Sequence, residues 1–106
     1  MTSESQLLAQ ILLALGRDPR CLVWRNNTGA LPDQRGRVIR FGLVGSADIL
    51  GCLRPSGRFL AIEVKAANGH QSIAQKNFQR VITQAGGVYI LAHSVEEAIH
   101  GVTQAS

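Results

Sequence analysis

The chain has 106 residues, 45% of them hydrophobic and 17% charged, and its formal net charge is +4. This length suits one domain with a real core, spanning residues 1–106, and the composition excludes a disordered chain. No apolar run approaches eighteen residues and no basic stretch precedes an apolar one at the N-terminus, so we expect a cytoplasmic protein with no membrane span and no secretory signal.

The basic residues are mostly arginines. Nine of the eleven basic side chains are Arg, whose planar fork suits phosphate groups. Six of them fall within the first forty residues: Arg17, Arg20, Arg25, Arg35, Arg37 and Arg40. This crowding favours a nucleic-acid-facing side on the folded domain.

The first forty residues predict a helix, a strand and a loop. Ser3 followed three residues later by Gln6 is typical of a capping box, and apolar residues then recur at helical spacing. Residues 21–24 are expected to form a strand. Residues 29–36 are expected to form a loop because they are rich in glycine and polar residues, and residues 38–41 are a weaker strand candidate.

The centre of the chain predicts a β-hairpin. Residues 47–53 and 58–64 are its two strands, and Pro55 and Gly57 suit a type I turn that starts at Arg54. The second strand is apolar on both faces, which is typical of a central strand in a layered α/β sheet.

The register of this hairpin decides which side chains meet. If Arg54 pairs with Gly57, Asp48 lies directly across from Glu63. A change of one residue in the turn puts Asp48 across from Val64, on the other face. The sequence leaves both registers open. In either register Glu63 is a carboxylate near the interior, which needs a partner charge or a metal ion.

A second helix and a further strand follow the hairpin. Ser72 and Gln75 have the spacing of a capping box, so they predict the start of a helix. The pair Gly86–Gly87 is expected to end this helix, and residues 88–92 read as a buried strand.

The last segment predicts a terminal helix. Ser94 and Glu97 again have capping-box spacing, and the helix is expected to fade by Gly101. Without the weak candidate at 38–41, the predicted order is helix, strand, strand, strand, helix, strand, helix. This order indicates an α/β fold.

The hairpin carries the residues that indicate chemistry. Glu63 and Lys65 are two apart on a strand, so they point to the same face, and Asp48 lies across from them in the first register. Mg²⁺ prefers oxygen ligands, which Asp48, Glu63 and the backbone carbonyl of Val64 supply. Lys65 would orient an attacking water or stabilise developing charge. The pattern predicts metal-dependent phosphodiester hydrolysis, and its alternative is a structural acid–lysine pair at the rim of a sheet.

Several short motifs in a fixed order extend this pattern over nearly the whole chain. They are Glu4, Arg25-Asn26-Asn27-Thr28-Gly29, Phe41-Gly42, Gly45-Ser46-Ala47-Asp48-Ile49-Leu50-Gly51, Glu63-Val64-Lys65, Gln75-Lys76-x-Phe78 and Gly86-Gly87-Val88-Tyr89. Together they resemble the virus-type replication-repair nuclease (VRR-NUC) domain of the PD-(D/E)XK superfamily.

The resemblance implies a fold and a set of catalytic residues. The implied fold is a restriction-endonuclease-like αβββαβ core, with a mixed central sheet flanked by helices and an extra C-terminal helix. The implied activity is DNA cleavage that depends on Mg²⁺ or Mn²⁺, with Asp48, Glu63 and Lys65 as the motif residues. The resemblance also implies active-site roles for Glu4 and Gln75, which otherwise suit a helix N-terminus and a helix cap.

Five residues are predicted to contact DNA. These are Arg25, Asn26, Arg37, Arg40 and Lys76. Arg25 and Asn26 equally suit an ordinary strand end, and a lysine at a position such as Lys76 is more often a solvated helix residue than a DNA contact.

The leading hypothesis is a phage or bacterial endonuclease of DNA repair, recombination or replication. A lone domain presents one site, so symmetric cutting of branched DNA, such as a four-way junction, implies a homodimer. The alternatives are a monomeric nickase or flap nuclease, and a nucleic-acid-binding module without catalysis. No GxxxxGK[ST] motif occurs, so no nucleotide cofactor is expected.

Overall fold

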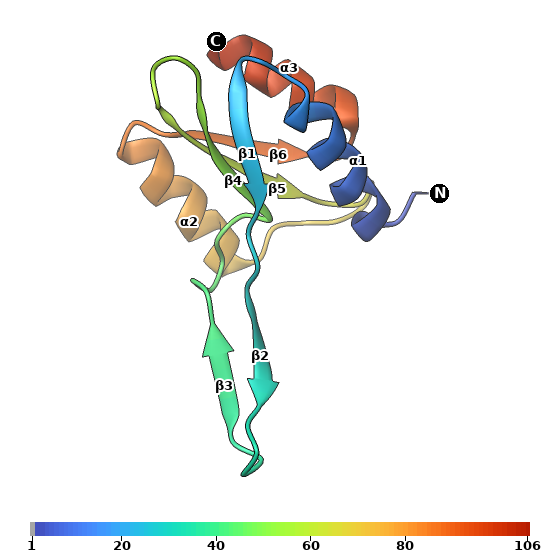
Figure 1. The fold of residues 1–106 in the computed structure, drawn as a ribbon, viewed down its shortest axis with the longest axis vertical. Coiled ribbons are helices and arrows are strands. Elements are labelled where there is room, and N and C mark those ends of the chain that lie inside the picture. Colours follow the sequence, from blue (N-terminus) through green and yellow to red (C-terminus); the bar gives the residue numbers. More distant parts are fainter. Residues whose placement is uncertain (1) are drawn as a thin grey trace.

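Residues 2–106 of the computed structural model form three helices and six strands (Figure 1). In chain order these are α1 (Glu4–Gly16), β1 (Cys21–Arg25), β2 (Gly29–Pro32), β3 (Val38–Phe41), β4 (Ile49–Leu53), β5 (Phe59–Val64), α2 (Ile73–Gln84), β6 (Val88–Ala92) and α3 (Val95–Ala105). The predicted mixed α/β fold is confirmed. Within this described range, no helix is both long and apolar enough to cross a membrane.

The central sheet has four strands in the order β1-β4-β5-β6. The pairs β1–β4 and β4–β5 are antiparallel, whereas β6 runs parallel to β5. Strand β5 is therefore interior, as its apolar residues on both faces predict, and five of its six residues are buried. Strands β2 and β3 form a separate antiparallel ribbon that projects from the body (Figure 1).

The hydrophobic core lies between the sheet and the pair α1 and α3. Leu7, Ile11 and Leu15 of α1 pack with Ile62 and other buried residues of the sheet. Helix α2 lies against the other face and is attached mainly to β6. No residue of α2 is buried, although its apolar residues follow one stripe. The two faces of the sheet are thus covered unequally.

The hairpin has the first of the two possible registers. Ile49 pairs with Ile62 and Leu50 with Ala61, so Asp48, one residue before β4, lies across from Glu63. The turn differs from the predicted type I turn, because it is closed one residue wider. The N–H of Gly57 donates to the carbonyl of Leu53, and the N–H of Leu53 donates to the carbonyl of Arg58, both at 2.8 Å. The wider turn leaves the pairing register of the two strands unchanged.

The predicted loop over residues 29–36 is wrong for its first half, because residues 29–32 form β2 and pair with β3. Asp33 closes the ribbon: its side chain accepts hydrogen bonds from the N–H groups of Arg35 and Arg37 at 2.9 and 2.8 Å. The glycine content of this stretch hid a strand, because Gly36 has φ +78 in the turn and Gly29 leaves room for the ring of Phe41.

The prediction that the last helix fades by Gly101 is also wrong, because α3 continues to Ala105. A Cβ atom at Gly101 would lie 2.6 Å from Cδ1 of Ile90. This glycine permits close packing of α3 on β6 and does not end the helix. The helix begins as predicted at Ser94, whose hydroxyl accepts the N–H of Glu97. The Glu97 carboxylate turns to His93 instead of completing the capping box.

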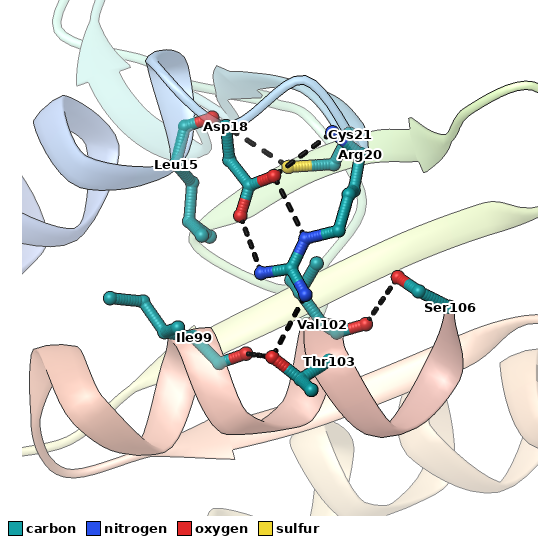
Figure 2. A network of polar contacts seen from close by, with 8 residues as sticks. All are labelled: Leu15, Asp18, Arg20, Cys21, Ile99, Val102, Thr103 and Ser106. Carbon is teal, nitrogen blue, oxygen red and sulfur yellow. Dashed lines mark hydrogen bonds and ion pairs between the residues drawn. The ribbon is translucent and has the colours of Figure 1, made fainter.

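Arg20, one of the six arginines within the first forty residues, is held by contacts inside the fold (Figure 2). Arg20 makes a bidentate ion pair with Asp18 at 3.0 and 2.8 Å, and its third nitrogen donates to the Thr103 hydroxyl of α3 at 2.9 Å. The side-chain hydrogen bond to Arg20 lowers the pKa of Asp18. Arg20 thus links the turn between α1 and β1 to α3, and its guanidinium is not free for phosphate.

Candidate metal centre

Asp48 and Glu63 meet at the end of the hairpin where β4 begins and β5 ends. Oδ2 of Asp48 accepts a hydrogen bond from the backbone N–H of Val64 at 2.9 Å. This contact fixes the carboxylate against the end of β5, on the same face as Glu63. The two carboxyl groups that the sequence singled out therefore lie side by side.

Glu63 is the most unusual group in this arrangement. It is 1% exposed, and its Oε1 atom has no hydrogen-bond partner among the described residues. Burial, together with the negative charge of Asp48, raises the pKa of Glu63 to about 8, against a smaller lowering by Lys65. A buried, incompletely satisfied carboxylate beside a second acid is costly for the fold, and such sites are often functional.

Two side chains contact the other oxygen of Glu63. Nζ of Lys65 lies 3.6 Å from Oε2, and the side-chain amide of Gln75 donates to the same atom at 3.1 Å. Gln75 also accepts the N–H of Ser72 at 2.9 Å, so it serves as helix cap and site contact at once. The cap at the start of α2 thereby fixes the orientation of the Glu63 carboxylate.

Asn26 holds the segment that carries Asp48. Its side-chain amide donates to the Ser46 hydroxyl at 2.8 Å and to the Ala47 carbonyl at 2.9 Å, and its backbone N–H donates to the Asp48 carbonyl at 2.8 Å. Asn26, which was predicted to contact DNA, thus supports the backbone on either side of Asp48. Ser46 belongs to the quoted motif around Asp48, but the sequence assigned it no role of its own.

Gly45, the first residue of the same motif, is a second supporting residue whose role the sequence did not indicate. It has φ +85, and a Cβ atom there would lie 2.5 Å from the carbonyl oxygen of Ala74. The turn before Asp48 therefore presses directly on the first turn of α2, which carries Gln75. Only glycine permits this approach.

Glu4 and Arg25 lie at the side of Asp48. With Ser5, Leu8 and Asp48 they line a cavity of about 190 Å³. Glu4 also accepts a long hydrogen bond of 3.4 Å from the N–H of Ala66, directly after Lys65. The structure thus brings Glu4, Arg25 and Asp48 to one opening, with the guanidinium available to an anion that enters there.

The remaining predicted DNA contacts lie on two separate elements. Lys76 is exposed on α2, one residue after Gln75. Arg37 and Arg40 lie on the β2–β3 ribbon, where Arg37 is paired with Asp33 at 3.0 Å and Arg40 is exposed.

The donor set suits a hard divalent cation. Asp48 and Glu63 supply carboxylate oxygens, and Oε1 of Glu63 lacks a partner that a cation would provide. Among residues 2–106, no three His, Cys, Asp or Glu side chains converge as a metal-binding group. Asp48 and Glu63 are therefore the two carboxylates here that could supply oxygen ligands, and any other ligands would be main-chain carbonyl, water and substrate oxygens.

No protein-family model and no curated protein matches this chain. The resemblance to the VRR-NUC domain thus rests on the sequence motifs alone.

Proposed function

We propose that this chain is a metal-dependent DNA endonuclease whose site is built on Asp48, Glu63 and Lys65. The observation that carries the proposal is the Glu63 carboxylate, which is buried, beside Asp48, and unpartnered at one oxygen. A purely structural acid–lysine pair would be expected to satisfy both oxygens. A divalent cation between the two carboxylates would remove both the repulsion and the missing contact.

The order of elements supports a nuclease architecture for this site. Without the β2–β3 ribbon and α3, the chain runs α1, β1, β4, β5, α2, β6, which is the αβββαβ order of a restriction-endonuclease-like core. Asp48 lies directly before β4, and Glu63 lies near the end of the interior strand β5. We infer that the ribbon and α3 are additions to this core.

The residues of the site have separate tasks in the proposed reaction. Asp48 and Glu63 would hold Mg²⁺ or Mn²⁺, together with the carbonyl of Val64. The bound cation would polarise the phosphate and lower the pKa of a water molecule. Lys65, at 3.6 Å from Glu63, favours the ionised carboxylate and would donate to the attacking water or to a phosphate oxygen. Gln75 keeps Glu63 from turning away.

Charge and position support DNA as the substrate. Arg25 at the cavity beside Asp48, with Lys76 on α2, would bind the phosphates on either side of the cut. We propose that two copies act together on branched DNA such as a four-way junction, because each chain supplies one site.

The test is a cleavage assay with folded protein. Labelled linear duplex, nicked, flapped and four-way-junction DNA are incubated with Mg²⁺, Mn²⁺ or EDTA, using wild type and the Lys65→Ala variant. We expect metal-dependent cutting by wild type and a loss of at least a hundredfold in the variant. The matched control is Lys76→Ala, which removes the other lysine and should weaken binding without abolishing cleavage.

The pattern of products distinguishes the alternatives. Paired symmetric cuts in the junction indicate a dimeric resolvase, and single cuts in nicked or flapped DNA indicate a monomeric nickase or flap nuclease. Tight DNA binding with no cleavage under either metal would instead identify a binding module and overturn the proposal.

A further inference from the structure

One large aromatic side chain of the central sheet is not part of the core. Trp24, the single tryptophan of the chain, lies in β1 and is 50% exposed. Leu22, two residues earlier on the same face, is 47% exposed, whereas Val23 between them packs against the core on the other face. Tryptophan is enriched at binding surfaces, because its ring is large and apolar. The ring of Trp24 is therefore available to a ligand.

The position of α2 leaves this face of β1 open. Helix α2 is attached mainly to β6, at the opposite edge of the sheet, and α1 packs on β1 from the core side. Trp24 pairs with Leu50 of β4, which is half-buried. We call the surface formed by Leu22, Trp24 and Leu50 the open face. It is apolar and carries no charge.

The open face leads directly to the two carboxylates. Leu50 also pairs with Ala61 of β5, so Trp24, Leu50 and Ala61 form one row across the sheet. Ala61 and Glu63 are two apart on β5 and share a face, so the next row on that face is the row of Asp48 and Glu63. The two rows are about 6.6 Å apart along the strands, which is about two base steps of B-DNA. The ring thus lies within one or two nucleotides of a phosphate held at the carboxylates.

The backbone holds the ring and the site in a fixed relation. The N–H of Asn26, two residues after Trp24, donates to the carbonyl of Asp48 at 2.8 Å. The pairing of β1 with β4 continues from there through Trp24 and Leu50. A ligand on the ring and a ligand at Asp48 would therefore be held by the same pair of strands.

We propose that Trp24 is the stacking platform for an unpaired base of the bound DNA, next to the phosphate that is cut. The inference rests on the proposed function and names one part of its substrate. In a duplex both faces of a base are covered by its neighbours, so a protein ring stacks on a base that is unpaired or turned out of the helix. The substrate therefore has at least one unpaired nucleotide beside the cut.

The charge beside the ring favours DNA over a protein partner. Arg25 follows Trp24 directly, is exposed, and lines the opening beside Asp48. Because β1 is an edge strand, Trp24 and Arg25 point to opposite faces of one open edge. A DNA strand that runs along this edge would place a base on the ring and a phosphate on the guanidinium. An aromatic ring paired with a cation is the usual combination in proteins that bind single strands.

The test measures DNA binding in EDTA, where metal-dependent cleavage does not occur. Trp24→Phe and Trp24→Leu are compared with wild type by fluorescence anisotropy of a labelled flapped duplex and of the fully paired duplex. Trp24→Phe keeps an aromatic face and should bind the flapped duplex nearly as wild type does. Trp24→Leu keeps only the apolar character and should bind it about 5- to 100-fold more weakly. All three proteins should bind the paired duplex equally, and circular dichroism should show the same fold.

The same contact can be removed from the DNA. Abasic nucleotides at the start of the unpaired strand keep the phosphates but lack the bases. Wild type and Trp24→Leu should bind this abasic flap equally, and as weakly as Trp24→Leu binds the normal flap. Because stacking displaces no counterion, both proteins should have the same salt slope, whereas a lost phosphate contact would lower it.

The tryptophan also reports on its own ligand. A base stacked on an indole quenches its emission, and Trp24 is the only tryptophan in the chain. Saturation with the normal flap should therefore quench the emission of wild type, and saturation with the abasic flap should not. Emission that changes with protein concentration alone, before DNA is added, would show that a second copy covers the ring and would overturn the proposal.

Two other results would overturn it. One is equal binding of the flapped duplex by wild type and Trp24→Leu. The other is an equal loss by Trp24→Leu on flapped, paired and abasic DNA, since Trp24 would then be structural. The outcome is separate from the test of the nuclease: binding that requires Trp24 without any cleavage would support the stacking platform and refute the endonuclease, and cleavage with unchanged binding in Trp24→Leu would do the reverse.

Discussion

The Asp48 carboxylate accepts a hydrogen bond from the backbone N–H of Val64 at 2.9 Å. Val64 lies between the two other motif residues, Glu63 and Lys65. The backbone of the motif strand itself therefore fixes the motif aspartate, while Asn26 holds the segment that carries it. Asp48 therefore has a structural role, accepting the Val64 N–H, which does not require its negative charge.

Asp48→Asn is expected to separate this structural role from the charge. The asparagine oxygen can still accept the Val64 N–H, so the melting temperature in EDTA should change by little. The lost charge should weaken Mn²⁺ binding by at least tenfold in calorimetry, and Mg²⁺-dependent cleavage should disappear. Glu96→Gln, which removes an exposed acid from α3, is the control and should bind Mn²⁺ normally. Full activity of Asp48→Asn at ordinary Mg²⁺ would refute the ligand assignment.

The buried Glu63 predicts a pH dependence of stability in the absence of metal. Its pKa is raised from 4.5 to about 8, so between these values the folded protein holds a proton that the unfolded chain has released. The free energy of unfolding should therefore be highest below about pH 4.5 with respect to this group. It should fall as pH rises toward 8, by a total on the order of a few kcal/mol.

Urea unfolding in EDTA at pH 5.5, 7 and 8.5 measures this dependence. The Glu63→Gln variant has no proton to lose, so its unfolding free energy should lack this fall and exceed that of wild type at pH 8.5. Mg²⁺ should stabilise wild type more at pH 8.5 than at pH 5.5, since the ionised carboxylate is the ligand. Parallel curves for the two proteins would mean that Glu63 is ionised throughout.

Arg25 and Asn26 are adjacent but are expected to respond differently to alanine. Arg25 is exposed beside Asp48, so Arg25→Ala should weaken DNA binding and lower the salt slope by about one unit if one phosphate is lost. Asn26→Ala removes hydrogen bonds to Ser46 and Ala47, which should cost about 1–3 kcal/mol of stability. Fluorescence titration at several salt concentrations and urea unfolding distinguish the two roles. An unchanged slope in Arg25→Ala would make that residue structural.

The parts of the fold that the sequence predicted are those set by local chemistry. Capping residues Ser3 and Ser72 mark the helix starts, and the doubly apolar strand through Glu63 is interior, because these signals lie in a few neighbouring residues. Residues 38–41, the weaker strand candidate, do form β3, but its partner β2 and the full length of α3 were missed. In both, a side chain distant in sequence leaves room only for glycine. The ring of Phe41 lies against Gly29, and the side chain of Ile90 lies against Gly101. A glycine that permits close packing looks, in sequence, like one that ends an element.

The site was predictable in part for the same reason. The alternation of a strand places Glu63 and Lys65 on one face, whereas the choice between two registers needed the structure. The support given by Asn26, Ser46 and Gly45 depends on contacts between separate segments, which no local pattern encodes. The burial that shifts the Glu63 pKa likewise arises only when α2 covers the strand end.

Gly51 offers a direct test of close approach within the central sheet. A Cβ atom at this position in β4 would lie 2.0 Å from the carbonyl oxygen of Leu22 and 2.9 Å from Cα of Val23, both in β1. Backbone atoms of a paired strand cannot rotate away, so Gly51→Ala should force β1 and β4 apart and cost roughly 2–4 kcal/mol.

Gly16→Ala is the matched control, because nothing lies within 4 Å of its Cβ position at the end of α1. It should be neutral or stabilise by about 0.5–1 kcal/mol, since helical alanine loses less backbone entropy on folding. Equal unfolding midpoints for the two variants in urea would show that β1 can shift without cost. In that case the pairing of β1 with β4 would not hold Asp48, whose carbonyl accepts the N–H of Asn26.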